Sequence, residues 1–259
     1  MRLILVTAVA LSAAAQAPTP PTFDVASVKI NKDFNSANRA TWASRITAVP
    51  GSLTMRNVNM TMIVAWAYHV QRPQVSGPSS MDSQRYDIAA KADHPAKDDE
   101  MRLMLQSLLV ERFTCKSHRV TKDVEALALV LPKQGTHKMT PSEVAEGEAQ
   151  GTHNQDGSDT VKGATLSNLM DELSRDLELP VVDMTGLHGR FDFTVNIQKY
   201  LTEMRSRYAN ESNVPPEAML RMNLLENIVA GELGLRVETR KAPVEFIVID
   251  SVETTPAEN

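Results

Sequence analysis

The chain has 259 residues, of which 42% are hydrophobic and 23% are charged, and its formal net charge is −5. This composition excludes a collagen, a coiled coil or a wholly disordered chain, and the length suits one large domain or two small ones. The acidic balance, with no basic stripe along the sequence, argues against nucleic acid as a partner.

The first 15 residues have the pattern of an export signal. One arginine precedes an apolar core, and Ala13 and Ala15 make an A-x-A site, so we expect cleavage after residue 15 or 17. A core helix is the alternative, but the prolines within 18–22 would break it. We therefore expect a periplasmic or extracellular protein. No later apolar run approaches the ~20 residues of a membrane span, so we expect no transmembrane segment after signal removal.

Four segments carry apolar residues at the i, i+3, i+4, i+7 spacing of a helix that packs on a core. Thr165 is placed to cap the third of these helices, with Asn168 three residues later, and Gly231 or Gly234 is placed to end the fourth. The four expected helices are centred on residues 60–70, 101–109, 166–177 and 222–229.

Strands are expected at 23–29, 52–58 and 159–164. The segments after the second and fourth helices each predict a hairpin, that is, two strands around a polar turn. These two exposed hairpins are expected at 116–125 and 236–245, followed by the apolar runs 127–131 and 246–249.

The order of elements repeats along the chain. Arg85 and Asp87 follow the first helix as Arg190 and Asp192 follow the third, with an aromatic residue inside each pair. We predict an α+β fold of two similar halves, each with two helices packed on a mostly antiparallel sheet, which suggests internal duplication. Chance similarity between two ordinary α+β stretches is the alternative.

The expected boundaries follow from composition. The first half spans 16–132, a polar linker spans 133–158, and the second half spans 159–259. A charged insertion at 199–214 interrupts the second half, as a mobile lobe or an extra helix.

Asp183, His188 and Asp192, around the glycines of DMTGLHGRFDF, are candidates for an acid–base cluster. A structural role explains them at least as well, because Asp183 can cap a turn through its side chain and Asp192 shares a strand face with Arg190. Arg85, Asp87, Arg190 and Asp192 are likewise candidates for binding, or for pairing within the fold.

The remaining reactive residues indicate neither a catalytic cysteine nor a metal site. Cys115 reads as a small buried hydrophobe, because no base lies on its strand face. The histidines show no metal-ligand spacing, and NQDGSD at 154–159 places its glycine too early for a calcium loop. His137 and His153 share the linker with two aspartates, but a solvated linker explains them better than a metal site. We expect no metal and no cofactor.

The motifs in combination resemble a known family. FDVASVK, GSLTMRNVNM, RYDI, MLQSLLVERF, PVVDMTGLHGRFDF and APVEFIVID are together similar to the "soil-associated" bacterial proteins, which share a domain of unknown function. The resemblance implies export and an α+β architecture, and related domains are similar to parts of membrane zinc peptidases of the antibiotic-sensor type. The helix-and-strand pattern also looks distantly similar to interaction domains of secretins and TonB-dependent receptors.

These observations predict an exported, non-enzymatic binding module. Its partner is expected to be an envelope protein that adds a strand to an exposed sheet edge, or a small ligand held between the two halves. Two other functions stay open: a secreted hydrolase with a site near Asp183, His188 and Asp192, and an accessory sensor domain for a membrane peptidase.

Overall fold

The computed structural model describes residues 20–33, 43–144, 149–209 and 214–257. The expected signal peptide lies outside the described residues, as does part of the charged insertion, 210–213. No helix within the described part of the chain is long and apolar enough to cross a membrane.

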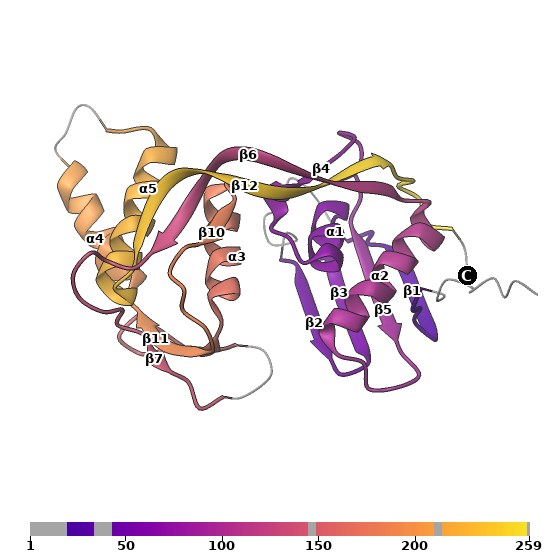
Figure 1. Cartoon of the computed structure of the whole chain (residues 1–259), viewed down its shortest axis with the longest axis horizontal. Helices are drawn as coiled ribbons and strands as arrows, with labels where there is room; N and C mark the ends of the chain where they lie inside the picture. The colour runs from indigo at the N-terminus through magenta and orange to yellow at the C-terminus, as the bar shows by residue number, and fades with distance from the viewer. Residues whose placement is uncertain (1–19, 34–42, 145–148, 210–213, 258–259) are drawn as a thin grey trace, which may run out of the picture.

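Two separate bodies are joined by a long two-stranded ribbon that runs along one side of both (Figure 1). The ribbon consists of β6 (Lys116–Val130) and β12 (Arg236–Ser251). The first body contains β1 (Val25–Ile30), β2 (Arg45–Val49), β3 (Ser52–Val58), α1 (Met60–Tyr68), η2 (Arg72–Gln74), β4 (Val75–Ser76), β5 (Tyr86–Lys91) and α2 (Asp98–Phe113). The second contains β7 (Thr140–Pro141), β8 (Gln150–His153), β9 (Asp159–Ala164), α3 (Leu166–Leu177), β10 (Val181–Asp183), β11 (Phe191–Val195), α4 (Ile197–Tyr208), α5 (Glu217–Ile228) and the π-helical turn η3 (Val229–Leu233).

The sheets are mostly antiparallel, which confirms the α+β class. The first body has the strand order β1-β5-β3-β2 and the second has β7-β11-β9-β8, with antiparallel pairing throughout. The ribbon forms a third sheet, β10-β6-β12-β4, in which β10 and β4 add parallel strands at opposite ends. Similar elements therefore recur in the same order in both bodies, while duplication of the chain stays a prediction.

The local signals for helix ends are confirmed. The Thr165 side chain accepts a hydrogen bond from the Asn168 N–H at 3.2 Å, and the Asn168 side chain accepts one from the Thr165 N–H at 2.9 Å. Gly234 has a φ of 67° and ends the helical segment that begins with α5. The charged insertion contains an extra helix, α4, which is one of its two expected forms.

The prediction of two hairpins is wrong. Residues 116–125 and 236–245 do not fold back but continue as parts of β6 and β12, which pair with each other from Arg236↔Val130 to Ser251↔Lys116. The physical reason is that a tight hairpin turn needs residues with positive φ, and neither segment contains a glycine or a residue in that conformation. The polar middle of each segment faces solvent instead of forming a turn.

The ribbon exchanges strands between the bodies. Leu127 and Leu129 follow α2 in the chain, yet they are buried in the core of the second body with Leu173 of α3. Ile247 and Ile249 come from the C-terminal strand and are buried in the core of the first body. Each body is therefore completed by apolar residues that arrive from the other part of the chain.

The segment 133–158 is not wholly irregular. It contributes β7, which pairs with β11, and β8, which pairs with β9, at the two edges of the sheet in the second body. Met139, just before β7, is buried in the same core. The boundaries of the two halves stay a prediction.

Candidate functional site

The expected acid–base cluster does not form a connected group. Asp183 ends β10, and its carboxylate accepts hydrogen bonds from the N–H and the hydroxyl of Thr185 at 2.8 and 2.7 Å. Asp192 lies on β11 and accepts one from the Gly163 N–H at 2.8 Å. His188 is exposed between them, and no hydrogen bond or ion pair joins these three described residues. Both carboxylates stabilise local backbone, which is the structural role that the sequence left open.

Arg190 and Asp192 together hold one residue of the neighbouring strand. The Arg190 guanidinium donates to the carbonyl oxygen of Gly163 at 2.6 Å, while Asp192 accepts from the N–H of the same residue. Gly163 has a φ of 70°, a conformation that favours glycine, and lies just before α3. Hydrogen bonds from the Ser142 hydroxyl and the Gly163 N–H lower the pKa of Asp192.

The first body contains the same arrangement. Arg85 donates to the carbonyl oxygen of Asn57 at 3.3 Å, and Asp87 accepts from the Asn57 N–H at 2.8 Å. Asn57 also has a positive φ, 53°, and lies just before α1. All four candidate binding residues therefore make contacts that fix a strand-to-helix junction in their own body.

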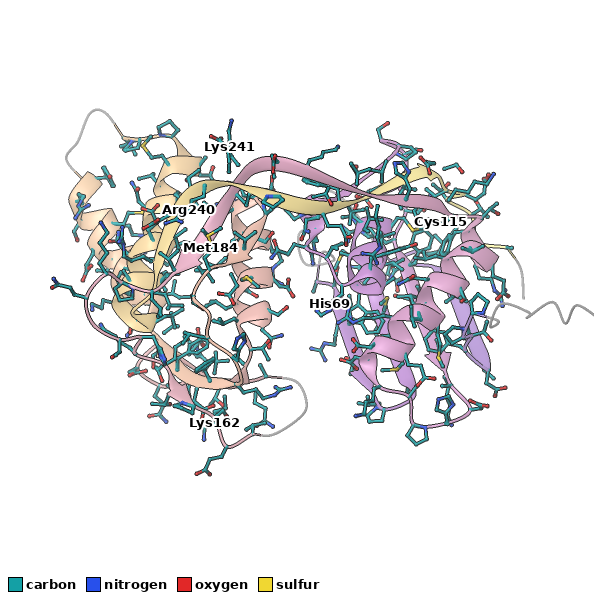
Figure 2. All side chains as sticks on the ribbon, in the orientation of Figure 1. His69, Cys115, Lys162, Met184, Arg240 and Lys241 are labelled. Carbon is teal, nitrogen blue, oxygen red and sulfur yellow. The ribbon has the colours of Figure 1, made fainter. Side chains whose placement is uncertain are left out.

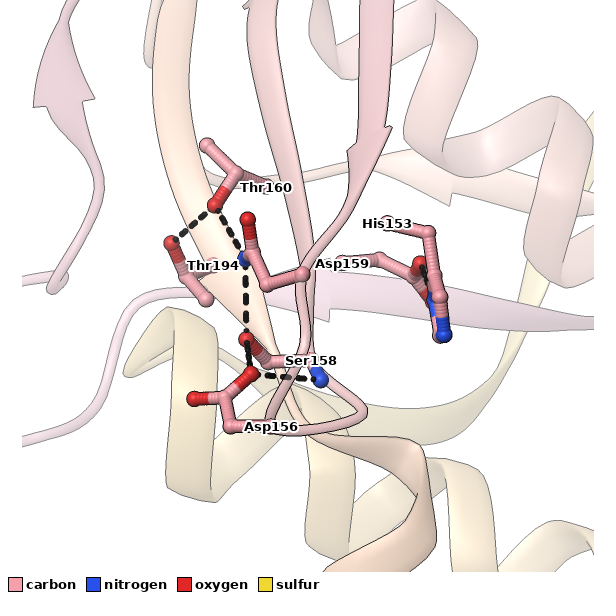
Figure 3. Close-up of polar contacts among 7 residues, drawn as sticks. His153, Asp156, Ser158, Asp159, Thr160 and Thr194 are labelled. Carbon is pink, nitrogen blue, oxygen red and sulfur yellow. Dashed lines mark hydrogen bonds and ion pairs between the residues drawn. The ribbon is translucent and has the colours of Figure 1, made fainter.

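NQDGSD forms the turn between β8 and β9 (Figure 3). The Asp156 carboxylate accepts hydrogen bonds from the N–H and hydroxyl of Ser158 at 3.0 and 2.7 Å, and Gly157 has a φ of 79°. His153 Nδ1 lies 2.8 Å from a carboxylate oxygen of Asp159. Among the described residues, no group of three or more His, Cys, Asp and Glu side chains is arranged to hold a metal ion.

The other reactive side chains are also accounted for. Cys115 is buried where α2 leads into β6 (Figure 2), and burial raises the pKa of its thiol to about 11, which disfavours the nucleophilic thiolate. The residue belongs to the helix-to-strand connection, because Phe113 ends α2 and β6 begins at Lys116. The His137 ring packs edge-on against Phe191, with 5.6 Å between ring centroids.

A cleft lies between the two bodies, where α1 and α2 face α3. Its volume of about 170 Å³ is below the roughly 300–1,000 Å³ of pockets for drug-sized ligands, so it suits a small molecule or one end of a larger one. His69 lies on the side of the first body that faces this cleft (Figure 2). The apolar lining comes from Ile46, Met62, Ala65, Trp66 and Val70, and the charged lining from Arg72, Arg102, Asp171 and Arg175.

Positive charge dominates the cleft. Arg102 lies over the Trp66 ring, 4.7 Å from its centroid, and donates a hydrogen bond to the Trp66 carbonyl oxygen. Burial lowers the pKa of Arg72 and of Arg102, yet a guanidinium remains charged in proteins. Burial raises the pKa of Asp171 to about 6, although the positive charges of Arg102, Arg175 and Arg72 lower it.

Acidic groups border this charge. Arg175 forms an ion pair with Glu172 one turn earlier on α3. At the start of α2, the negative charges of Asp98 and Asp99 act to raise the pKa of Arg102, against the effect of burial. Partial burial lowers the pKa of His69, and the Arg102 charge lowers it further, so both effects disfavour a positive charge on this ring.

A single glutamine fixes the two walls. The Gln71 side chain donates to the Val181 carbonyl oxygen and accepts from the Val181 N–H, both at 2.8 Å, as a neighbouring strand would. Gln74 completes the link, because it donates to the Glu245 carbonyl oxygen of β12 and accepts from the Gln71 N–H. The first body is thereby tied both to β10 of the second body and to the ribbon.

Sequence reasoning missed Gln71, Arg72, Arg102, Asp171 and Arg175. They come from three elements that are far apart in the chain, and each looks in the sequence like a solvated position of a helix or loop. No motif or spacing connects them, so no sequence signal was present to find them.

Comparison with known proteins places the chain in a family without naming an activity. No curated protein matches the chain, and no solved structure matches it either. A family model described as "Protein of unknown function (DUF3738)" matches residues 61–252, which include the ribbon and every charged residue of the cleft. The chain therefore belongs to the DUF3738 family.

Proposed function

We propose that this protein is an exported, non-enzymatic binding module that holds a small ligand in the cleft between its two bodies. The observation that carries the proposal is the cleft itself: charged side chains converge there beside Trp66, between walls that Gln71 ties together. Preformed concave sites with a few convergent polar groups on an apolar lining are the usual form of a ligand site. The signal-like N-terminus supports export.

A non-enzymatic role is supported by the contacts of the candidate acid–base residues. Asp183 and Asp192 accept hydrogen bonds from backbone that they stabilise, and among the described residues no hydrogen bond or ion pair joins His188 to either. A hydrolase would need such groups within hydrogen-bond reach of one another or of a shared substrate position.

A screen of small molecules by thermal shift tests the proposal. A ligand of the cleft should raise the melting temperature of the wild type but not of Ala65→Phe, which fills the lining. Ala89→Phe, on the exposed face of β5, is the matched control and should keep the response. Circular dichroism checks that both variants fold. If ligands stabilise the wild type and Ala65→Phe equally, the cleft is not their site.

The open edge of β6 favours a second candidate, capture of an extended segment of an envelope protein. The Leu127 N–H and Leu129 carbonyl oxygen bond to the β10 segment, so alternate residues of β6 direct their backbone groups away from β12. In the described part of the chain no strand pairs with this edge over 116–125. Strand addition uses such edges. The opposite edge of the ribbon, on β12, is less suited because it contains Pro243, which lacks an N–H.

Cross-linking in the native envelope tests this second function. Thr121→Pro removes an outward N–H of β6 without removing a bond to β12, and should abolish a cross-link to a partner protein. Lys122→Ala, at the next position, should leave the cross-link intact. A partner whose cross-link survives Thr121→Pro does not bind by strand addition at this edge.

A further inference from the structure

The cleft holds cationic groups that the protein itself does not fully pair. Within the described residues, Arg72 makes no hydrogen bond or ion pair through its guanidinium, and the buried Nε of Arg102 has no hydrogen-bond partner. The charge of Asp171 acts to raise the pKa of both arginines, but among the described residues Asp171 forms no ion pair within 4.0 Å. The guanidinium of Arg72 therefore lines a space that the side chains leave open, and Arg102 beside it holds a buried donor without an acceptor.

We propose that this space binds a small anionic ligand through a carboxylate or a phosphoryl group held by Arg72, Arg102 and Arg175. The inference rests on the proposed function and names its ligand class. A guanidinium carries five N–H donors in a planar fork that matches the oxygens of both groups. An anion between the arginines would supply acceptors for donors that otherwise face one another's positive charge.

The arginines are prepared for this role to different degrees. The guanidinium of Arg102 is held in place by the Trp66 ring and carbonyl oxygen, so it loses little conformational entropy when a ligand binds. Arg175 lines the opposite wall because α3 places it there, and it already pairs with Glu172 of the same helix at an exposed position. Arg72 is only partly shielded from solvent, and its guanidinium makes no hydrogen bond in the described structure, so it can close over a ligand from the loop that Gln71 anchors.

Asp171 opposes the binding of an anion in the cleft. Its carboxylate partly balances the three guanidinium groups while the cleft is empty, and it repels an anion that enters. Removal of this one charge should strengthen anion binding, whereas removal of any of the three arginine charges should weaken it. Opposite effects from neighbouring side chains would locate the anion between them.

Isothermal titration calorimetry of the purified protein at constant ionic strength tests the inference. Sodium sulfate, which stays fully ionised at neutral pH, is the probe for a tetrahedral group, and sodium acetate is the probe for a carboxylate. We expect saturable binding of at least one, weakened about tenfold by Arg72→Gln, the loss of one charge-assisted hydrogen bond. Asp171→Asn should strengthen it. The tighter of the two probes identifies the ligand's acidic group.

Arg56→Gln is the matched control, because this arginine is exposed on β3 outside the cleft and its loss changes the net charge equally. Equal weakening by Arg56→Gln and Arg72→Gln would show that the anions only screen surface charge, and would overturn the inference. Absence of saturable binding of both probes would overturn it too. If a neutral compound then stabilises the wild type but not Ala65→Phe, the proposed binding function stands without the anion.

Discussion

Truncation of Leu129 tests the strand exchange directly. Leu129 lies on β6, directly after the first body in the chain, but its side chain is fully buried in the core of the second body. Leu129→Ala removes three carbon atoms, worth about 0.8 kcal/mol each when buried, and the remaining cavity adds to this loss. We therefore expect the second body to lose roughly 3–4 kcal/mol of stability.

Hydrogen exchange with mass spectrometry measures the loss of stability separately in each part of the chain. Protection should fall in α3 and β11, which share the core with Leu129, before it falls in α1 and β3 of the first body. Ile247→Ala should do the reverse, since this residue of β12 is buried in the first core. Leu103→Ala, at an exposed position on α2, is the control and should change little.

The refuting result is equally specific. If Leu129→Ala loosens the first body and leaves the second unchanged, then β6 folds back onto its own half as a hairpin. The same conclusion would follow if Ile247→Ala loosened only the second body.

Three further perturbations test the linked bodies and their junctions. Gln71→Ala leaves the Val181 N–H and carbonyl oxygen without their side-chain partner. We therefore expect the free energy of unfolding, measured in urea, to fall by about 1–3 kcal/mol, and proteolysis between the bodies to become faster. An unchanged urea midpoint would show that Gln71 does not hold the two walls of the cleft together. Because burial raises the pKa of Asp171 to about 6 in the folded state, its contribution to stability is present at low pH and is lost as pH rises through about 6. Asp171→Asn should therefore raise the melting temperature at pH 7.5 but not at pH 4, and an equal gain at both would contradict the shift. Asp192→Ala should destabilise the second body, because the Gly163 N–H loses its side-chain acceptor, and Asp192→Asn should be milder. Chemical denaturation checks this, and equal midpoints for the wild type and Asp192→Ala would contradict it.

Much of the local structure could be predicted because its causes are local. Helical periodicity located α1, α2, α3 and α5, because a helix with apolar residues on one face is stable when that face packs against a core. The Thr165 cap and the strands at 52–58 and 159–164 followed from side chains within a few residues of one another.

The candidate site could not be predicted in the same way. The Arg-x-Asp pairs attracted attention because they recur, and recurrence proved to mark a junction that both bodies need. The cleft residues do not recur and belong to no motif. Their common feature is a position in space, which depends on how Gln71 sets one body against the other.

The sequence by itself therefore determined four of the helices, the Thr165 cap, the α+β class and the apolar runs at 127–131 and 246–249. Only the tertiary structure decided which body each run completes. Each polar stretch lacks a glycine for a tight turn, and it continues as a strand because it pairs with a partner strand more than a hundred residues away. That long-range pairing made the ribbon, and the ribbon, with the Gln71 bridge, placed the charged walls of the cleft opposite each other.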